Sequence, residues 1–111
     1  MNGNYINLIG RITRDIELKE GSTGKGKDKK TFSYCYGTLA YNVDKDNTYF
    51  IEFRANGKTA ELLSEYAPKG TLVSLEGYLS TFVPKDEKFE RLQVVVNSVK
   101  FLSSVKNSDD K

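Results

Sequence analysis

The sequence contains no histidine and no tryptophan, and its 111 residues include a single cysteine and two prolines. Without histidine, the usual general base near neutral pH is missing, and so is a partner for a nucleophilic cysteine or a zinc site. The lone Cys35 excludes an internal disulfide and favours a reducing compartment. These absences argue against an enzyme, and no metal or cofactor is expected.

Long apolar runs and targeting patterns are also missing. No stretch approaches the roughly 20 apolar residues of a membrane helix, and the start, MNGNYINLIG, lacks the basic and apolar regions of a signal peptide. No glycine-rich phosphate loop precedes a helix, and the carboxylate pairs Asp86-Glu87 and Asp109-Asp110 lie in polar, solvated segments. We therefore expect a soluble, cytoplasmic, non-catalytic protein without a membrane partner.

What the chain does contain is alternation of apolar and polar residues, which is typical of strands. One block, residues 48–82, reads as a strand, a break at Asn56-Gly57, a short helix and a second strand. Pro68 ends the helix, and its predicted buried face is formed by Leu62, Leu63 and Tyr66. Further strands are predicted over residues 4–13, continuing through 14–19 beyond a bend at Gly10, and over 31–41 and 89–102.

This order of three strands, a helix and two strands predicts a fold class. It is all-β with one short helix: the OB-fold, a five-stranded Greek-key barrel. A chain of 111 residues forms one such domain. The predicted division is the OB-fold barrel over residues 1–102 and a short flexible C-terminal tail over 103–111, which lacks apolar periodicity.

Seven tyrosines and six phenylalanines, several of them on strand faces away from the predicted core, point to a binding surface. Unpaired bases stack on aromatic rings while cations follow the phosphates, so aromatics interleaved with basic residues suit single-stranded nucleic acid. The alternative is that the rings fill the core or a subunit interface, which we prefer for Tyr34, Tyr41, Phe89 and Phe101. The candidate nucleic-acid-binding residues are Arg11, Lys25, Lys27, Lys29, Lys30, Tyr36, Phe50, Arg54, Tyr78, Phe82, Lys85, Lys88 and Arg91.

The lysine-rich segment 20–30 holds three glycines and no apolar side chain, which predicts a mobile hairpin loop. It has two readings: a solvated linker, or a basic flap that closes on an anion. Positive charge is concentrated in this region: residues 19–30 carry five lysines against two acids, whereas the whole chain has a formal net charge of only +2.

Several segments resemble the bacterial-type single-stranded DNA-binding protein family. They are Asn4 to Asp15 (NYINLIGRITRD), Thr38-Leu39-Ala40, Phe50 with the NGKTAE of residues 56–61, Lys69-Gly70, the LEGYL of residues 75–79, Val94 to Val96 and Phe101-Leu102. The resemblance covers residues 4–102. It implies sequence-independent single-stranded DNA binding in replication, recombination and repair.

The resemblance also implies a homotetramer, with a dimer as the alternative, and replication or recombination proteins as further partners. The chain departs from the family pattern in several places. Asn56 and Pro84 stand where the family commonly has an aromatic residue, and the short tail lacks the acidic, hydrophobic-tipped end that recruits partners. A short-tailed form suits a phage- or mobile-element-encoded member acting in a bacterial cell or infected host. The rival functions are an OB-fold protein-interaction module, such as a primosome component, and an oligosaccharide-binding barrel, which would lack tryptophan for sugar stacking.

Overall fold

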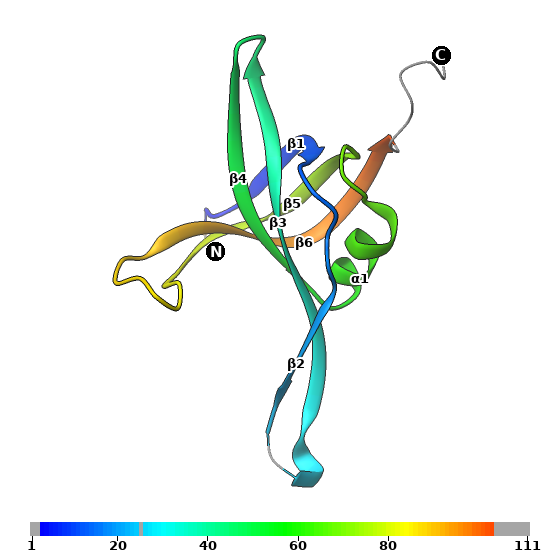
Figure 1. Ribbon diagram of the computed structural model, residues 1–111, viewed down its shortest axis with the longest axis vertical. Coiled ribbons are helices and arrows are strands. Elements are labelled where there is room, and N and C mark those ends of the chain that lie inside the picture. Colours follow the sequence, from blue (N-terminus) through cyan, green and yellow to red (C-terminus); the bar gives the residue numbers. More distant parts are fainter. Residues whose placement is uncertain (1–2, 25, 104–111) are drawn as a thin grey trace.

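Six strands form one strongly bent sheet in the computed structural model, which describes residues 3–24 and 26–103 (Figure 1). The strand order is β1-β5-β6-β4-β3-β2, and a further pairing of β1 with β3 closes the barrel. β4 and β6 run parallel, and the other paired strands run antiparallel. The elements are β1 (Ile6–Ile12), β2 (Lys19–Thr23), β3 (Lys30–Asp44), β4 (Asn47–Asn56), α1 (Gly57–Tyr66), β5 (Leu72–Phe82) and β6 (Arg91–Ser103). The predicted five-stranded Greek-key barrel is confirmed, with β2 added to it.

β1 joins both sides of the barrel, because it changes partners along its length. Residues Ile6 to Arg11 pair with β5, and Arg11 and Ile12 also pair with β3. Gly10 permits this crossing, since a Cβ there would overlap the carbonyl oxygen of Ala40. At Gly10, where a bend was predicted, the structure shows a close approach of β3 instead. The pairing of β1 with β5 has no bulge at this point.

The segment after β1 differs from its prediction. Residues 14–18 are not a strand, and the chain resumes strand structure only at Lys19. The predicted loop over residues 20–30 is in part β2, which pairs with the start of β3 from Lys19↔Tyr34 to Thr23↔Lys30. A short 3-10 turn, Gly26–Asp28, lies between the two strands. β2 and β3 form an arm that extends away from the barrel (Figure 1).

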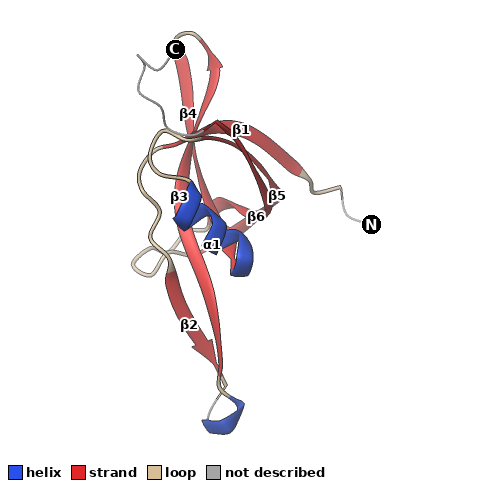
Figure 2. Ribbon diagram, turned by 90° about the vertical axis from the view of Figure 1, so that its right-hand side faces the viewer, coloured by secondary structure: helices blue, strands red, loops and turns tan. Residues whose placement is uncertain are grey.

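α1 packs against β3, β4 and β6 at one end of the barrel (Figure 2). Gly57 adopts a φ of 60° at the turn from β4 into α1, a conformation that glycine accepts without strain. The end is set by Pro68, as predicted, and the last helical bond joins the Ala67 amide to the Leu63 carbonyl at 3.1 Å. The predicted buried face was wrong in part: Ala60, Leu63 and Ala67 are buried, whereas Tyr66 is 56% exposed.

The core lies between α1 and the middle of the barrel. Inward-facing residues of neighbouring strands meet there, including the pair Phe53↔Val94 and the residue Leu39. Cys35 is fully buried among them, and burial raises the pKa of its thiol to about 11, while a backbone hydrogen bond to Ala55 acts in the opposite direction. The thiol is therefore protonated at neutral pH and serves as a small core residue.

The barrel is less filled at the end away from α1. Apolar residues from β1, β4, β5 and β6 line a hollow of about 600 Å³ there; they include Ile6, Leu8, Phe50, Ile51, Leu79 and Leu92. Two hairpins leave the barrel near this end: β3–β4 and β5–β6 (Figure 1). No helix within residues 3–24 and 26–103 is long and apolar enough to cross a membrane.

Candidate nucleic-acid interface

A row of four outward-facing residues crosses four neighbouring strands. Tyr36 on β3 is paired with Arg54 on β4, Arg54 with Val95 on β6, and Val95 with Tyr78 on β5. Their sequence neighbours Phe53 and Val94 point into the core, so alternation places the row on the outside of the barrel. We call the outward side of β3, β4, β6 and β5 the outer face. Three of the predicted site residues, Tyr36, Arg54 and Tyr78, thus share one surface.

The Arg54 guanidinium lies over two neighbouring tyrosine rings. Its central carbon lies 5.0 Å from the ring centroid of Tyr34 and 5.6 Å from that of Tyr36, within the range of cation–π attraction. Its Nε donates a hydrogen bond of 3.1 Å to the side-chain oxygen of Asn56. These contacts fix a positive charge beside two partly exposed rings, the combination that stacking on bases and pairing with phosphates requires.

The aromatic surface continues along β3 toward the arm. Tyr34 contacts the edge of Tyr36, with centroids 5.6 Å apart, and lies 5.8 Å from Phe32. The Phe32 ring rests on Gly21 of β2, where any Cβ would overlap it. Tyr34 does not fill the core, because strand alternation puts it on the outer face with Tyr36; a place in a subunit interface stays a prediction. Phe89 is 79% exposed, so it also lies outside the core.

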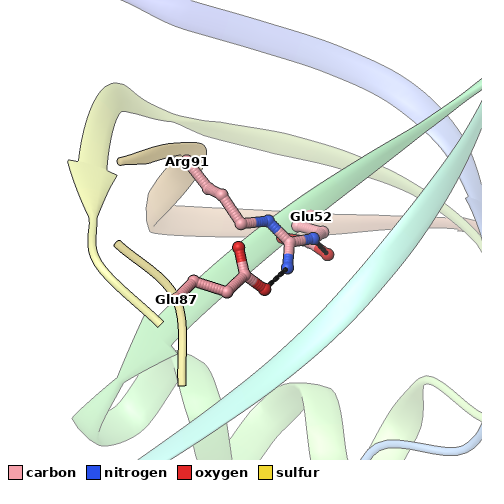
Figure 3. A network of polar contacts seen from close by, with 3 residues as sticks. All are labelled: Glu52, Glu87 and Arg91. Atoms are coloured by element: carbon pink, nitrogen blue, oxygen red, sulfur yellow. Dashed lines mark hydrogen bonds and ion pairs between the residues drawn. The ribbon is translucent and has the colours of Figure 1, made fainter. Parts of the chain in front are cut away.

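Arg91 is already paired with two carboxylates. Its Nη2 lies 2.5 Å from Glu52 on β4, and its Nη1 lies 3.3 Å from Glu87 in the β5–β6 hairpin (Figure 3). The two acids compensate the arginine charge and tie the hairpin to β4. The structure therefore places Arg91 on the outer face, opposite Phe82, with its donors engaged by protein.

A second hollow, of about 380 Å³, opens on the outer face beside this ion pair. Its lining includes Arg14, Tyr36, Glu52, Phe82, Arg91 and Gln93. Two rings, two guanidinium groups, a carboxylate and an amide thus border one space.

The remaining predicted residues lie around the outer face or away from it. Lys27, Lys29 and Lys30 are exposed at the end of the β2–β3 arm, and Lys85 and Lys88 are exposed in the β5–β6 hairpin. Lys25 lies outside the described residues. Arg11 is separated from the others on β1, where its Nη1 donates to the Gly70 carbonyl at 2.8 Å. Phe50 is 69% exposed and borders the apolar hollow.

Sequence reasoning did not select Arg14, Phe32 or Gln93 for this surface, and it placed Tyr34 elsewhere. The parity shared by Phe32, Tyr34 and Tyr36 was a usable signal for β3. Gln93 had no such signal in the sequence, because only the β6 register shows that it lies on the outward side between Arg91 and Val95.

Among the residues that the structure describes, no three His, Cys, Asp or Glu side chains are grouped to hold a metal ion. The pKa of Asp44 is lowered, since the Asn47 amide and the Asp46 backbone N–H donate hydrogen bonds to its carboxylate in the β3–β4 turn. That interaction stabilises the turn and lies away from the outer face.

The chain is similar to known proteins over nearly its whole length. The model of the Single-strand binding protein family matches residues 3–102. The chain is 36% identical over 103 residues to a single-stranded DNA-binding protein of Fusobacterium nucleatum subsp. nucleatum, a match that covers 88% of this chain and 66% of the relative. It is 31% identical over 116 residues to one of Helicobacter pylori, covering 96% and 61%, and 32% identical over 107 residues to one of Staphylococcus aureus, covering 93% and 67%. The chain thus spans about two thirds of the length of these relatives.

The fold has a counterpart among solved structures. A mitochondrial single-stranded DNA-binding protein from S. cerevisiae superposes with a TM-score of 0.70 at 21% sequence identity, covering 96% of this chain and all of that one. At this identity the likeness supports the OB-fold alone. The family match, the similarity to bacterial relatives and the barrel topology agree, and the chain belongs to the Single-strand binding protein family.

Proposed function

We propose that this protein binds single-stranded DNA without sequence choice through the outer face. The observation that carries the proposal is the row Tyr36–Arg54–Val95–Tyr78 in a member of this family. Aromatic rings on β3 and β5 would stack on bases, each contributing about 1–3 kcal/mol. Arg54 would pair with a phosphate while remaining held by Tyr34.

The cations around the outer face fit a bound strand that crosses it. The arm with Lys27, Lys29 and Lys30 and the β5–β6 hairpin with Lys85 and Lys88 correspond to the two loops that OB-folds use for oligonucleotides. Both would supply phosphate contacts and steer association. Duplex DNA would bind weakly, because paired bases hide the ring faces that stacking needs. Arg11, which donates to the Gly70 carbonyl in the turn before β5, would contribute little.

The biological setting follows from the family. We propose that the protein coats unwound DNA during replication, recombination and repair in the cytoplasm of a bacterial cell or phage-infected host, as a binding protein without enzymatic activity. We also propose a homotetramer, with a dimer as the alternative. Ile9 and Tyr5 on the outside of β1 are 50% and 69% exposed, and burial between copies would stabilise the assembly.

A titration with oligo(dT), followed by tyrosine fluorescence, tests the proposal. Because the chain has no tryptophan, the signal comes from tyrosines, and stacking on Tyr36 and Tyr78 should quench it. A hairpin duplex of the same length is the control and should bind far more weakly. Light scattering on the same samples reports the mass of the assembly.

The same titration addresses the rival function, a protein-interaction module. Such a module would leave the tyrosine signal unchanged with oligo(dT) at low salt. That result, in a folded sample, would refute single-stranded DNA binding.

A further inference from the structure

Under the proposed function, the carboxylate of Glu52 is unexpected, because it lies within the surface that would bind DNA. It lies on the outer face of β4, opposite Thr38 and one outward position from Arg54. Its pairing with Arg91 accounts for the charge, but a carboxylate on this surface would still disfavour nearby phosphates. Glu52 nevertheless lines the hollow of about 380 Å³, and its side chain is 39% exposed.

The polar groups of this hollow retain free capacity for hydrogen bonds. Arg91 contacts Glu52 through Oε2 alone, and a carboxylate has about four acceptor positions on its two oxygens. Gln93 is only 8% exposed. Its side-chain amide makes no hydrogen bond to another residue within 3–24 and 26–103. No fully buried side-chain nitrogen or oxygen in these residues lacks a partner, so the amide of Gln93 is not fully buried. It is therefore not sealed in the core, and Gln93 lines both this hollow and the larger apolar one.

The walls of the hollow have the shape and chemistry of a base-binding pocket. Tyr36 and Phe82 provide apolar ring surface on two sides, and Arg14 adds a positive charge at the border. A volume of about 380 Å³ is at the small end of the range for ligand pockets, roughly 300–1,000 Å³. This volume is large enough for one nucleobase.

We propose that this hollow is a pocket for one nucleobase of the bound strand and that Glu52 makes it favour cytosine over thymine. The inference rests on the proposed function. The N4 amino group of cytosine is a donor, which a carboxylate accepts well, whereas thymine presents the O4 acceptor at the same position. Glu52 therefore attracts cytosine and repels the O4 of thymine, while Gln93 can serve either base because its amide both donates and accepts.

The experiment compares the affinities for oligo(dC) and oligo(dT) of equal length, at slightly alkaline pH to keep oligo(dC) unfolded. In Glu52→Gln the side chain can donate as well as accept, so the preference for cytosine should fall. We expect the ratio of the two dissociation constants, dT over dC, to fall by about three- to tenfold, because a hydrogen bond to a charged acceptor is replaced by a weaker one to a neutral acceptor. Using a ratio cancels the general gain in affinity from removing a negative charge.

Glu87→Gln is the matched control. It removes the same charge and the other carboxylate partner of Arg91, but Glu87 does not line the hollow. In Glu87→Gln, the ratio of the dissociation constants for oligo(dT) and oligo(dC) should equal that of the parent. Gln93→Leu should weaken binding to both oligonucleotides and leave their ratio unchanged.

The outcomes separate the two proposals. An equal change of ratio in Glu52→Gln and Glu87→Gln would show a general electrostatic effect of Arg91 and overturn the pocket. An unchanged ratio in Glu52→Gln, with strong binding to both oligonucleotides, would overturn the pocket and leave single-stranded DNA binding intact. Failure of the folded parent to bind either oligonucleotide would refute the proposed function, and the pocket with it.

Discussion

The lysines at the end of the β2–β3 arm and Arg91 should contribute very differently to DNA binding. Lys27, Lys29 and Lys30 are exposed, whereas Arg91 is compensated by Glu52 and Glu87. Affinity for a single strand falls with salt at a log–log slope of roughly 0.7 per neutralised phosphate. Full engagement of three lysines would therefore contribute about 2 to the slope.

A triple variant, Lys27→Gln, Lys29→Gln and Lys30→Gln, removes the positive charges of the arm. Ordering an arm and its long side chains costs conformational entropy, so we expect partial engagement and a slope that is flatter by about 1–2. Arg91→Gln should change the slope by much less than 0.7, the contribution of a single phosphate contact, because its charge is already paired. The assay is a series of oligo(dT) titrations at increasing salt concentration.

A second triple variant controls for net charge. Lys58, Lys69 and Lys100 are exposed on α1, before β5 and near the end of β6, away from the arm. Replacing these three by Gln lowers the formal net charge from +2 by three, to −1, as the arm variant does. Equal slopes in the two variants would mean that the arm makes no local phosphate contacts. A flattening in Arg91→Gln as large as in the arm variant would refute the argument about charge compensation.

Three further predictions concern the rings, the thiol and the backbone. Tyr36→Leu should weaken oligo(dT) binding by about 1 kcal/mol or more, whereas Tyr66→Leu, at a similarly exposed tyrosine on α1, should leave the affinity unchanged; equal losses would place the binding surface elsewhere. The raised pKa of Cys35, about 11 against an ordinary 9.0, means that the folded state holds the proton more tightly than the unfolded state. Its contribution to stability is thus complete below pH 9 and is lost as the pH rises through 11, so urea titrations should show a steeper alkaline loss in the parent than in Cys35→Ala. Gly77→Ala should destabilise the fold by about 1–3 kcal/mol, because its Cβ would overlap the Val95 carbonyl, while Gly3→Ala, in open space, should be neutral in thermal unfolding.

The barrel was predictable because its strands obey one simple rule. Residues facing the core alternate with residues facing outward in β1, β4 and β5, so periodicity alone located them. β2 had no such signal. Its sequence, KEGST, is polar and exposed on nearly every residue, and its strand structure depends on pairing with β3, which lies beyond a turn. Local periodicity cannot detect a strand that buries nothing.

The candidate site was predictable to the extent that it depends on parity. Alternation predicts outward positions for Arg54 and Tyr78 but is ambiguous for Tyr36, and the register aligns all three in one row. The state of Arg91 was not predictable, since Glu52 is 39 residues away in sequence and only the parallel pairing of β4 and β6 brings them together. Single-sequence patterns give the direction of a side chain but not its long-range partner.

The register also bears on how a chain without tryptophan would form a stacking surface under the proposed function. Asn56 stands where the family commonly has an aromatic residue, and Tyr34 is its direct partner on the neighbouring strand. The ring that is missing from the end of β4 is thus supplied one strand over, on β3, where Phe32 and Tyr36 extend it in both directions. Asn56 in turn accepts the hydrogen bond that orients Arg54 over Tyr34 and Tyr36. Under the proposed function, a bound strand would therefore be drawn along β3 toward the lysines of the arm, because its rings and cations lie in that direction.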